Sequence, residues 1–64
     1  MLTLLVDPDC MHCRSISNLL TYKGIVFQIE TVDGDIYDVP ILKTEYNEEY
    51  VGFQGCLEYI RNNF

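Results

Sequence analysis

The shortness of the chain limits its fold more than any other feature. A chain of 64 residues buries only about 60% of the surface that it exposes when unfolded, so it forms a single small core. Hydrophobic residues make up 48% of the sequence, which is too many for a disordered segment. We therefore expect one folded domain that spans residues 1–64 and has no room for a deep substrate cleft.

The charge of the chain excludes several classes of partner. Ten acidic and four basic side chains give a formal net charge of -6, and the basic residues form no cluster. The sequence therefore predicts no binding to nucleic acid and none to anionic membranes. No apolar run approaches the length of a membrane span, and the start of the chain lacks the basic flank of a signal peptide. We expect a cytoplasmic monomer.

The hydrophobic pattern of the first half predicts a strand, a helix and a second strand. Residues 1–6 are an apolar run that is too short for a helix and is stopped by a turn sequence. From Cys13 to Lys23 apolar positions recur at helical spacing, and Gly24 follows where a left-handed C-cap belongs. Residues 25–31 alternate between apolar and polar side chains, which is typical of a half-solvated strand.

The second half is predicted to contain two more strands and a closing helix. A turn at residues 33–35 precedes the strand 39–44, which has Pro40 near its start, where proline is tolerated. Residues 49–51 form a short last strand, and residues 52–55 are expected to break it. The apolar residues that then recur at helical spacing are Leu57, Ile60 and Phe64.

Two cysteines lie between the first predicted strand and the first helix, separated by two residues. This context makes C-x-x-C a redox motif rather than a chance spacing. At the helix start Cys10 meets unpaired backbone N–H groups and the positive end of the helix dipole, and both stabilise its nucleophilic thiolate. Cys13 lies one helical turn further on and is expected to be the buried thiol that resolves a mixed disulfide.

Charged neighbours are expected to tune the Cys10 thiolate. A partly protonated His12 would stabilise it, whereas the carboxylates of Asp7 and Asp9 would oppose it weakly, since salt screens exposed charges. We expect the helix end and His12 to outweigh the two carboxylates. The alternative is that His12 is only an exposed turn residue.

A zinc site is the main alternative for the cysteines. Cys10, His12, Cys13 and Cys56 are four candidate ligands. Structural zinc sites usually pair two short ligand motifs, however, and here Cys56 stands alone while His12 lies inside the C-x-x-C loop. The sequence therefore favours a site without metal, in which Cys56 is a small, half-buried residue at the start of the last helix.

Three segments of the sequence carry a family resemblance. They are Pro8-Asp9-Cys10-Met11-His12-Cys13, Val39-Pro40-Ile41-Leu42, and Val51-Gly52-Phe53-Gln54 before the closing helix. Together they resemble the glutaredoxins and the NrdH-type redoxins of the thioredoxin fold, over the whole chain. The resemblance implies a minimal α/β (α+β) fold of the order β-α-β-β-β-α with a four-stranded mixed sheet.

The same resemblance implies roles for individual residues. It makes Cys10 the attacking thiolate, Cys13 the resolving thiol and Pro40 a cis proline. The backbone of Val39, next to that proline, would pair with an incoming peptide or thiol. Further contacts with a substrate or partner are expected from Met11, Arg14, Gly52 and Phe53.

Two departures from the family pattern affect these expectations. Glutathione-binding members usually carry a lysine shortly before the first cysteine, where this chain has Asp7, so Arg14 would have to supply the missing cation. The turn at Gly52-Phe53 is closer to the NrdH-type redoxins. Only residues 32–39 separate the second strand from the cis proline, so the helix that other members have there is expected to be absent.

The function that the resemblance implies is thiol-disulfide oxidoreductase activity on protein disulfides. No cofactor is needed besides the redox-active disulfide Cys10–Cys13, and the reductant would be thioredoxin reductase, or glutathione as a co-substrate. Ribonucleotide reductase is the electron acceptor that the NrdH resemblance suggests. The alternatives are a redox-inactive binding adaptor with the same fold and a small zinc module.

Overall fold

The first strand is the centre of the sheet, because other strands pair with both of its edges. β1 (Leu2–Val6) runs parallel to β2 (Phe27–Thr31) on one side and antiparallel to β3 (Ile41–Lys43) on the other. β4 (Glu49–Val51) pairs antiparallel with β3. The strand order across the sheet is therefore β2-β1-β3-β4.

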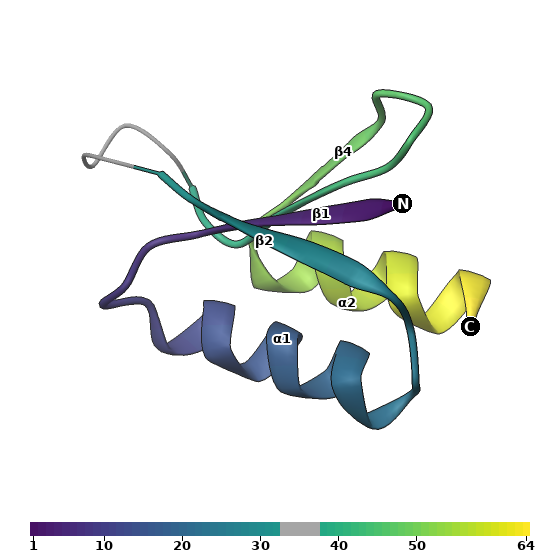
Figure 1. The fold of residues 1–64 in the computed structure, drawn as a ribbon, viewed down its shortest axis with the longest axis horizontal. Coiled ribbons are helices and arrows are strands. Elements are labelled where there is room, and N and C mark those ends of the chain that lie inside the picture. Colours follow the sequence, from purple (N-terminus) through teal and green to yellow (C-terminus); the bar gives the residue numbers. More distant parts are fainter. Residues whose placement is uncertain (33–37) are drawn as a thin grey trace.

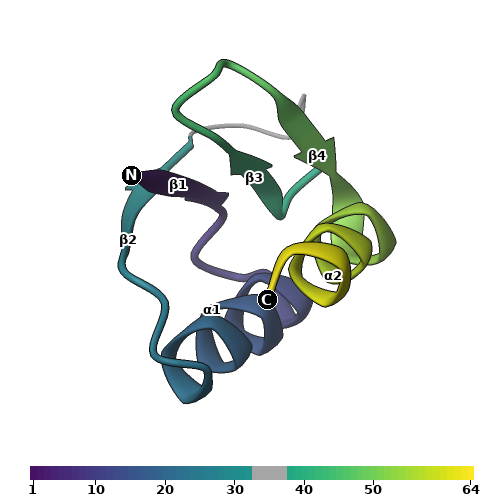
Figure 2. The same cartoon turned by 90° about the vertical axis from the view of Figure 1, so that its right-hand side faces the viewer.

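Two helices complete the part of the chain that the computed structural model describes, residues 1–32 and 38–64. α1 (Met11–Tyr22) connects β1 to β2, and α2 (Gly52–Asn63) follows β4 directly. Both lie on the same side of the sheet (Figures 1 and 2), and neither is long and apolar enough to cross a membrane. The chain thus forms a small α+β domain with a four-stranded mixed sheet, and the predicted order of elements is confirmed.

Two expectations fall on residues 33–37, which lie outside the described part of the chain. The first is the turn at Asp33-Gly34-Asp35. The second is the absence of a helix between Val32 and Val39.

The hydrophobic core fills the space between the sheet and the two helices. Side chains alternate along a strand, so Leu2 and Leu4 of β1 both face the helices and belong to the core. The completely buried aliphatic side chains come from both layers: Leu4, Ile16, Leu20, Leu42 and Ile60. Burying one such side chain stabilises a fold by roughly 1.5–3 kcal/mol. This single apolar layer holds both helices against the sheet.

Gly24 ends α1. Its φ of 73° lies in the left-handed region that favours glycine, and its N–H donates to the Thr21 carbonyl while the N–H of Ile25 donates to that of Leu20, both at 3.0 Å. This is a Schellman motif, so the left-handed residue expected after the helix is confirmed. Because the motif occupies Gly24 and Ile25, β2 begins at Phe27 and not at residue 25, where the prediction started it.

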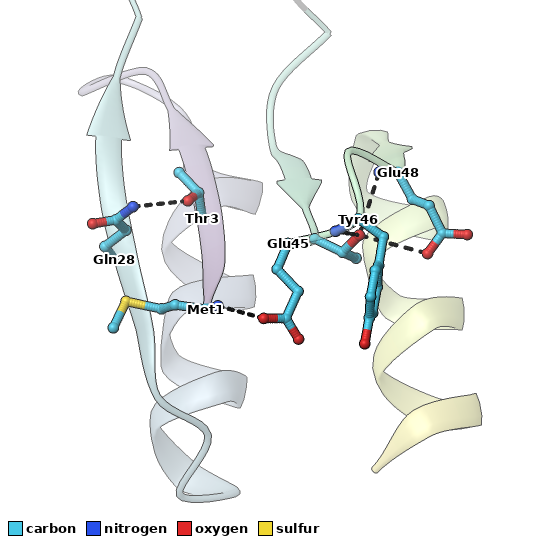
Figure 3. Close-up of polar contacts among 7 residues, drawn as sticks. Met1, Thr3, Gln28, Glu45, Tyr46 and Glu48 are labelled. Atoms are coloured by element: carbon cyan, nitrogen blue, oxygen red, sulfur yellow. Dashed lines mark hydrogen bonds and ion pairs between the residues drawn. The ribbon is translucent and has the colours of Figure 1, made fainter.

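A buried threonine organises the turn between β3 and β4 (Figure 3). The Thr44 hydroxyl accepts the N–H groups of Tyr46 at 3.2 Å and Glu48 at 3.3 Å, and it donates to the Glu48 carboxylate at 3.5 Å. Asn47 has a φ of 64°, which asparagine tolerates better than most residues. These bonds satisfy a side chain that is only 6% exposed, and they return the chain alongside β3.

The last helix begins earlier than predicted. The sequence predicts a break over residues 52–55, whereas α2 starts at Gly52, directly after β4. Gly52 makes the bend by itself, because its φ is 80° and its N–H donates to the Pro40 carbonyl at 2.8 Å. A Cβ added to Gly55 would lie 3.4 Å from the carbonyl carbon of Tyr50. That distance is an ordinary van der Waals contact, so Gly55 is a regular residue of the helix and not a break.

Three further details differ from the prediction. Phe64 follows the helix and is 57% exposed, so it does not belong to the buried stripe of α2. Ile29 shares the helix-facing side of the sheet with Phe27, as predicted, but it is 53% exposed because β2 is an edge strand. β3 covers only Ile41–Lys43 of the predicted strand 39–44.

We expect Gly24→Ala to lower the free energy of unfolding by about 1 kcal/mol, because a left-handed backbone is costly for alanine. An added Cβ there would meet nothing within 4 Å, so the loss comes from the backbone alone. Urea unfolding followed by circular dichroism measures it. Gly24→Asn is the matched control and should lose less, since asparagine adopts positive φ more readily. Equal losses in the two variants would contradict this explanation.

Candidate active site

A turn after β1 brings Cys10 to the start of α1. The Asp7 carboxylate accepts the N–H of Asp9 at 2.9 Å, and the Asp7 carbonyl accepts the N–H of Cys10 at 3.0 Å. Cys10 then adopts an extended backbone and is the N-cap of the helix. The helix therefore begins at Met11, with Cys10 at its start as predicted, although the apolar helical spacing becomes visible only from Cys13.

The Cys10 sulfur lies between two backbone groups of opposite polarity. It accepts the N–H of Cys13 at 3.0 Å, where other helices usually use a serine or aspartate oxygen. On its other side the Val39 carbonyl lies 3.8 Å away and accepts the thiol proton. The donated N–H and the helix dipole stabilise a negative charge on this sulfur, whereas the carbonyl favours the protonated thiol.

Cys13 lies behind Cys10 and is 2% exposed. Burial is the main cause that raises the pKa of its thiol from 9.0 to about 11, and a hydrogen bond to the Cys10 side chain adds to the rise. The charges of Cys10 and Asp7 raise the pKa further, while a hydrogen bond to the Asp7 backbone lowers it. Asp7 therefore acts on the second thiol, whereas the sequence predicts its effect on Cys10 alone.

Segments that are distant in sequence meet at Cys10. The peptide bond between Val39 and Pro40 is cis, and Pro40 is buried. The Pro40 carbonyl accepts the N–H of Gly52 at 2.8 Å, so the start of α2 lies against the segment that borders the Cys10 sulfur. The structure thus links Cys10 to Gly52 through two hydrogen bonds and the Val39–Pro40 peptide bond between them.

The rings of His12 and Phe53 join the first turns of the two helices. Their centroids are 4.9 Å apart and their planes are inclined by 35°, and His12 remains exposed. The predicted role of His12 beside the thiolate stays a prediction, since the contact that the structure shows is the one with Phe53. Next to it the Met11 side chain is 78% exposed. Apolar surface therefore lies beside Cys10 and is accessible to a partner.

A groove of about 200 Å³ is lined by both cysteines of the motif. Arg14, a predicted contact residue, lines it, and so do Ser17 and Ile29, which the sequence analysis missed. Ser17 had a usable signal, because it follows Cys13 by four residues and so lies on the same helix face. Asp9 is exposed. A larger hollow of about 460 Å³ lies elsewhere and is lined by neither cysteine of the motif.

The Cys56 side chain contacts backbone carbonyls and neither cysteine of the motif. It is completely buried, more so than the predicted half-buried position, and its sulfur lies 3.4 Å from the Pro40 carbonyl and 3.3 Å from that of Tyr50. All three cysteines are free thiols. Within residues 1–32 and 38–64, no three His, Cys, Asp or Glu side chains are grouped closely enough to bind a metal ion.

In comparisons with protein-family models, curated proteins and solved structures, the chain shows no significant match. What the site does is therefore inferred from its geometry.

Limited iodoacetamide treatment of the reduced protein should label Cys10 before Cys13 and Cys56. The pKa of each of the two buried thiols is raised from 9.0 to about 11, which lowers the thiolate fraction at neutral pH by about 100-fold. Peptide mapping by mass spectrometry measures the order. In urea the three cysteines should react at similar rates. Faster labelling of either buried cysteine in the folded protein would show that the roles are wrongly assigned.

Proposed function

We propose that the protein is a dithiol-disulfide oxidoreductase, a redoxin of the glutaredoxin and NrdH type, that reduces protein disulfides. One observation carries the proposal: the half-buried Cys10 sulfur accepts the N–H of Cys13 at the start of a helix, and the Cys13 thiol is buried behind it. This arrangement supports a reaction in which one thiol attacks and the other follows. The mixed sheet with both helices on one side, and Val39 bordering Cys10, agree with a thioredoxin-like layout.

The proposed reaction has two exchange steps. In the first, the Cys10 thiolate attacks a substrate disulfide, so that a bond from Cys10 to one substrate sulfur forms and the other substrate sulfur leaves as a thiolate. In the second, Cys13 loses its proton and attacks the Cys10 sulfur, and the bound substrate sulfur leaves. Two electrons pass from the dithiol to the substrate, and the two departing thiolates take up the two protons that the cysteines lose.

The resulting disulfide needs an external reductant, and we propose thioredoxin reductase as the favoured one. Asp7 lines the groove beside Cys10, and its negative charge repels the carboxylates of glutathione. Arg14 lines the same groove and is the side chain that would bind glutathione if glutathione is used. Oxidation of NADPH in the presence of each reducing system tells the two donors apart.

The partner surface follows from the contacts around the sulfur. Met11 is exposed, and Phe53 and Val39 are partly exposed, so a substrate meets apolar groups next to the reactive atom. The acidic charge of the chain, -6 overall, favours substrates with basic residues near their disulfide. Ribonucleotide reductase is the substrate that the resemblance to NrdH-type redoxins suggests, and we include it in the proposal.

The proposed activity predicts a specific pattern of cysteine variants. With dithiothreitol as the reductant, the protein should accelerate insulin reduction, and Cys10→Ser should abolish the acceleration. Cys13→Ser should instead trap a mixed disulfide between Cys10 and the substrate, visible by non-reducing mass spectrometry. Ser15→Ala, on the exposed face of the same helix, is the control and should leave turnover unchanged. A binding adaptor would show no acceleration and no trapped species.

Resolution of a mixed disulfide should become faster as the pH rises. Cys13 must be deprotonated to attack, and burial holds its pKa above the ordinary value of 9.0. In the mixed disulfide Cys10 carries no charge, but the contributions of Cys10 to the raised pKa are smaller than that of burial, so the pKa of Cys13 stays raised. The measurement uses the mixed disulfide that Cys10 forms with dithiobis(nitrobenzoate). The rate at which Cys13 releases thionitrobenzoate from it should rise by about tenfold per pH unit between about pH 6 and pH 8. A rate that does not change over this range would contradict the protonated state of Cys13.

A further inference from the structure

The third cysteine lies where three backbone segments meet. The Cys56 side chain projects from α2, and its sulfur is within hydrogen-bonding distance of the carbonyls of Pro40, just before β3, and Tyr50 in β4. Burial raises the pKa of the thiol to about 11, and a hydrogen bond to the Leu42 backbone offsets part of the rise. The proton therefore stays on the sulfur at neutral pH, and Cys56 is a donor.

Two adjacent residues, Val39 and Pro40, connect this donor to the reactive Cys10 sulfur. The Pro40 carbonyl accepts the N–H of Gly52 at 2.8 Å, and it shares the single Cys56 thiol proton, at 3.4 Å, with the Tyr50 carbonyl at 3.3 Å. Val39, which is bonded to Pro40, places its own carbonyl 3.8 Å from the Cys10 sulfur. A change in how Pro40 is held therefore reaches the Val39 carbonyl directly through the backbone.

An apolar side chain of the same volume as cysteine would fill the buried position of Cys56 equally well. The surrounding core is aliphatic, with Leu42 and Ile60 completely buried, so packing alone does not call for sulfur. Cysteine differs from alanine or valine in one property that matters here, its S–H donor. A buried carbonyl is more firmly held when its second lone pair also has a partner.

We infer that Cys56 is a positioning residue, which through Pro40 holds the Val39 carbonyl against the Cys10 sulfur and so restrains the reactivity of Cys10. The carbonyl oxygen carries partial negative charge and opposes the thiolate. When the restraint is released, Cys10 becomes more reactive. The inference deepens the proposed redox function and rests on it for its biological meaning, but the alkylation of Cys10 can be measured whether or not the protein turns over a disulfide.

The test compares four variants of the full chain. Cys56→Ala and Cys56→Val both remove the donor, and the valine variant keeps the side-chain volume if alanine destabilises the fold too far. Cys56→Ser keeps a donor. Ile60→Val, one turn along the same buried face of α2, is the matched control that perturbs packing without touching Pro40. For each variant the rate of iodoacetamide labelling of Cys10 at neutral pH and the melting temperature are measured.

The two donor-free variants should label Cys10 about threefold faster than the parent chain, the size expected from one weak hydrogen bond. Cys56→Ser should return the rate to near that of the parent, and Ile60→Val should lower the melting temperature without changing the rate. If labelling follows the melting temperature across all four variants, or does not change in any, Cys56 is only a packing residue. Failure of the parent chain to reduce insulin would overturn the proposed function while leaving this comparison intact.

Discussion

The first turn of α1 has N–H groups without partners inside the helix, and the chain satisfies one of them with the sulfur of Cys10. This capping bond determines where the helix starts, and the start determines which side chains face the sheet. A shift of the helix by one residue against the sheet would rotate every side chain by about 100° and would turn Ile16 and Leu20, both completely buried, away from the core. The same bond therefore positions the reactive atom and the hydrophobic contacts that hold α1 in place.

A chain this short covers one face of its sheet with helices, and the other face depends on its own side chains. Across the strands, Gln28, Thr3, Lys43 and Glu49 form one row in the pairing register, and the Gln28 amide donates to the Thr3 hydroxyl at 3.0 Å (Figure 3). Lys43 and Glu49 are opposite charges on paired strands, which is a favourable combination. A row of polar side chains suits contact with water. The alternation of apolar and polar residues along β2 already predicts that one face of the strand is solvated.

Local signals predicted most of the fold. The C-x-x-C pair after a short apolar strand, the alternation after Gly24 and the spacing of Leu57 and Ile60 each depend on neighbours in sequence, and the corresponding elements are present. The start of α2 was missed because Gly52 looks like a strand breaker until its N–H is seen to bond to Pro40. Such a bond joins residues from different elements, and no local pattern contains it.

The candidate site likewise has features that local sequence signals predict and features that depend on contacts between distant segments. The positions of Cys10 and Cys13 follow from the helix start, which the sequence indicates. The groove with Ile29 and the complete burial of Cys56 depend instead on how α1 and α2 lie under the sheet, which short-range periodicity does not determine. The ring contact of His12 with Phe53 also depends on long-range packing, since it joins the first turns of two helices and the two residues are 41 positions apart in the chain.

Three cysteines thus occupy three environments that differ in burial and in hydrogen bonding. Cys10 is half-buried and accepts a backbone N–H, whereas Cys13 and Cys56 are buried and their pKa values are raised to about 11. In the proposed reaction this difference sets the order of events, because a protonated second thiol does not compete for the substrate. It becomes a nucleophile only when it loses its proton, and its hydrogen bond to Cys10, one cause of its raised pKa, weakens once that sulfur is no longer charged. The first exchange step therefore favours the second.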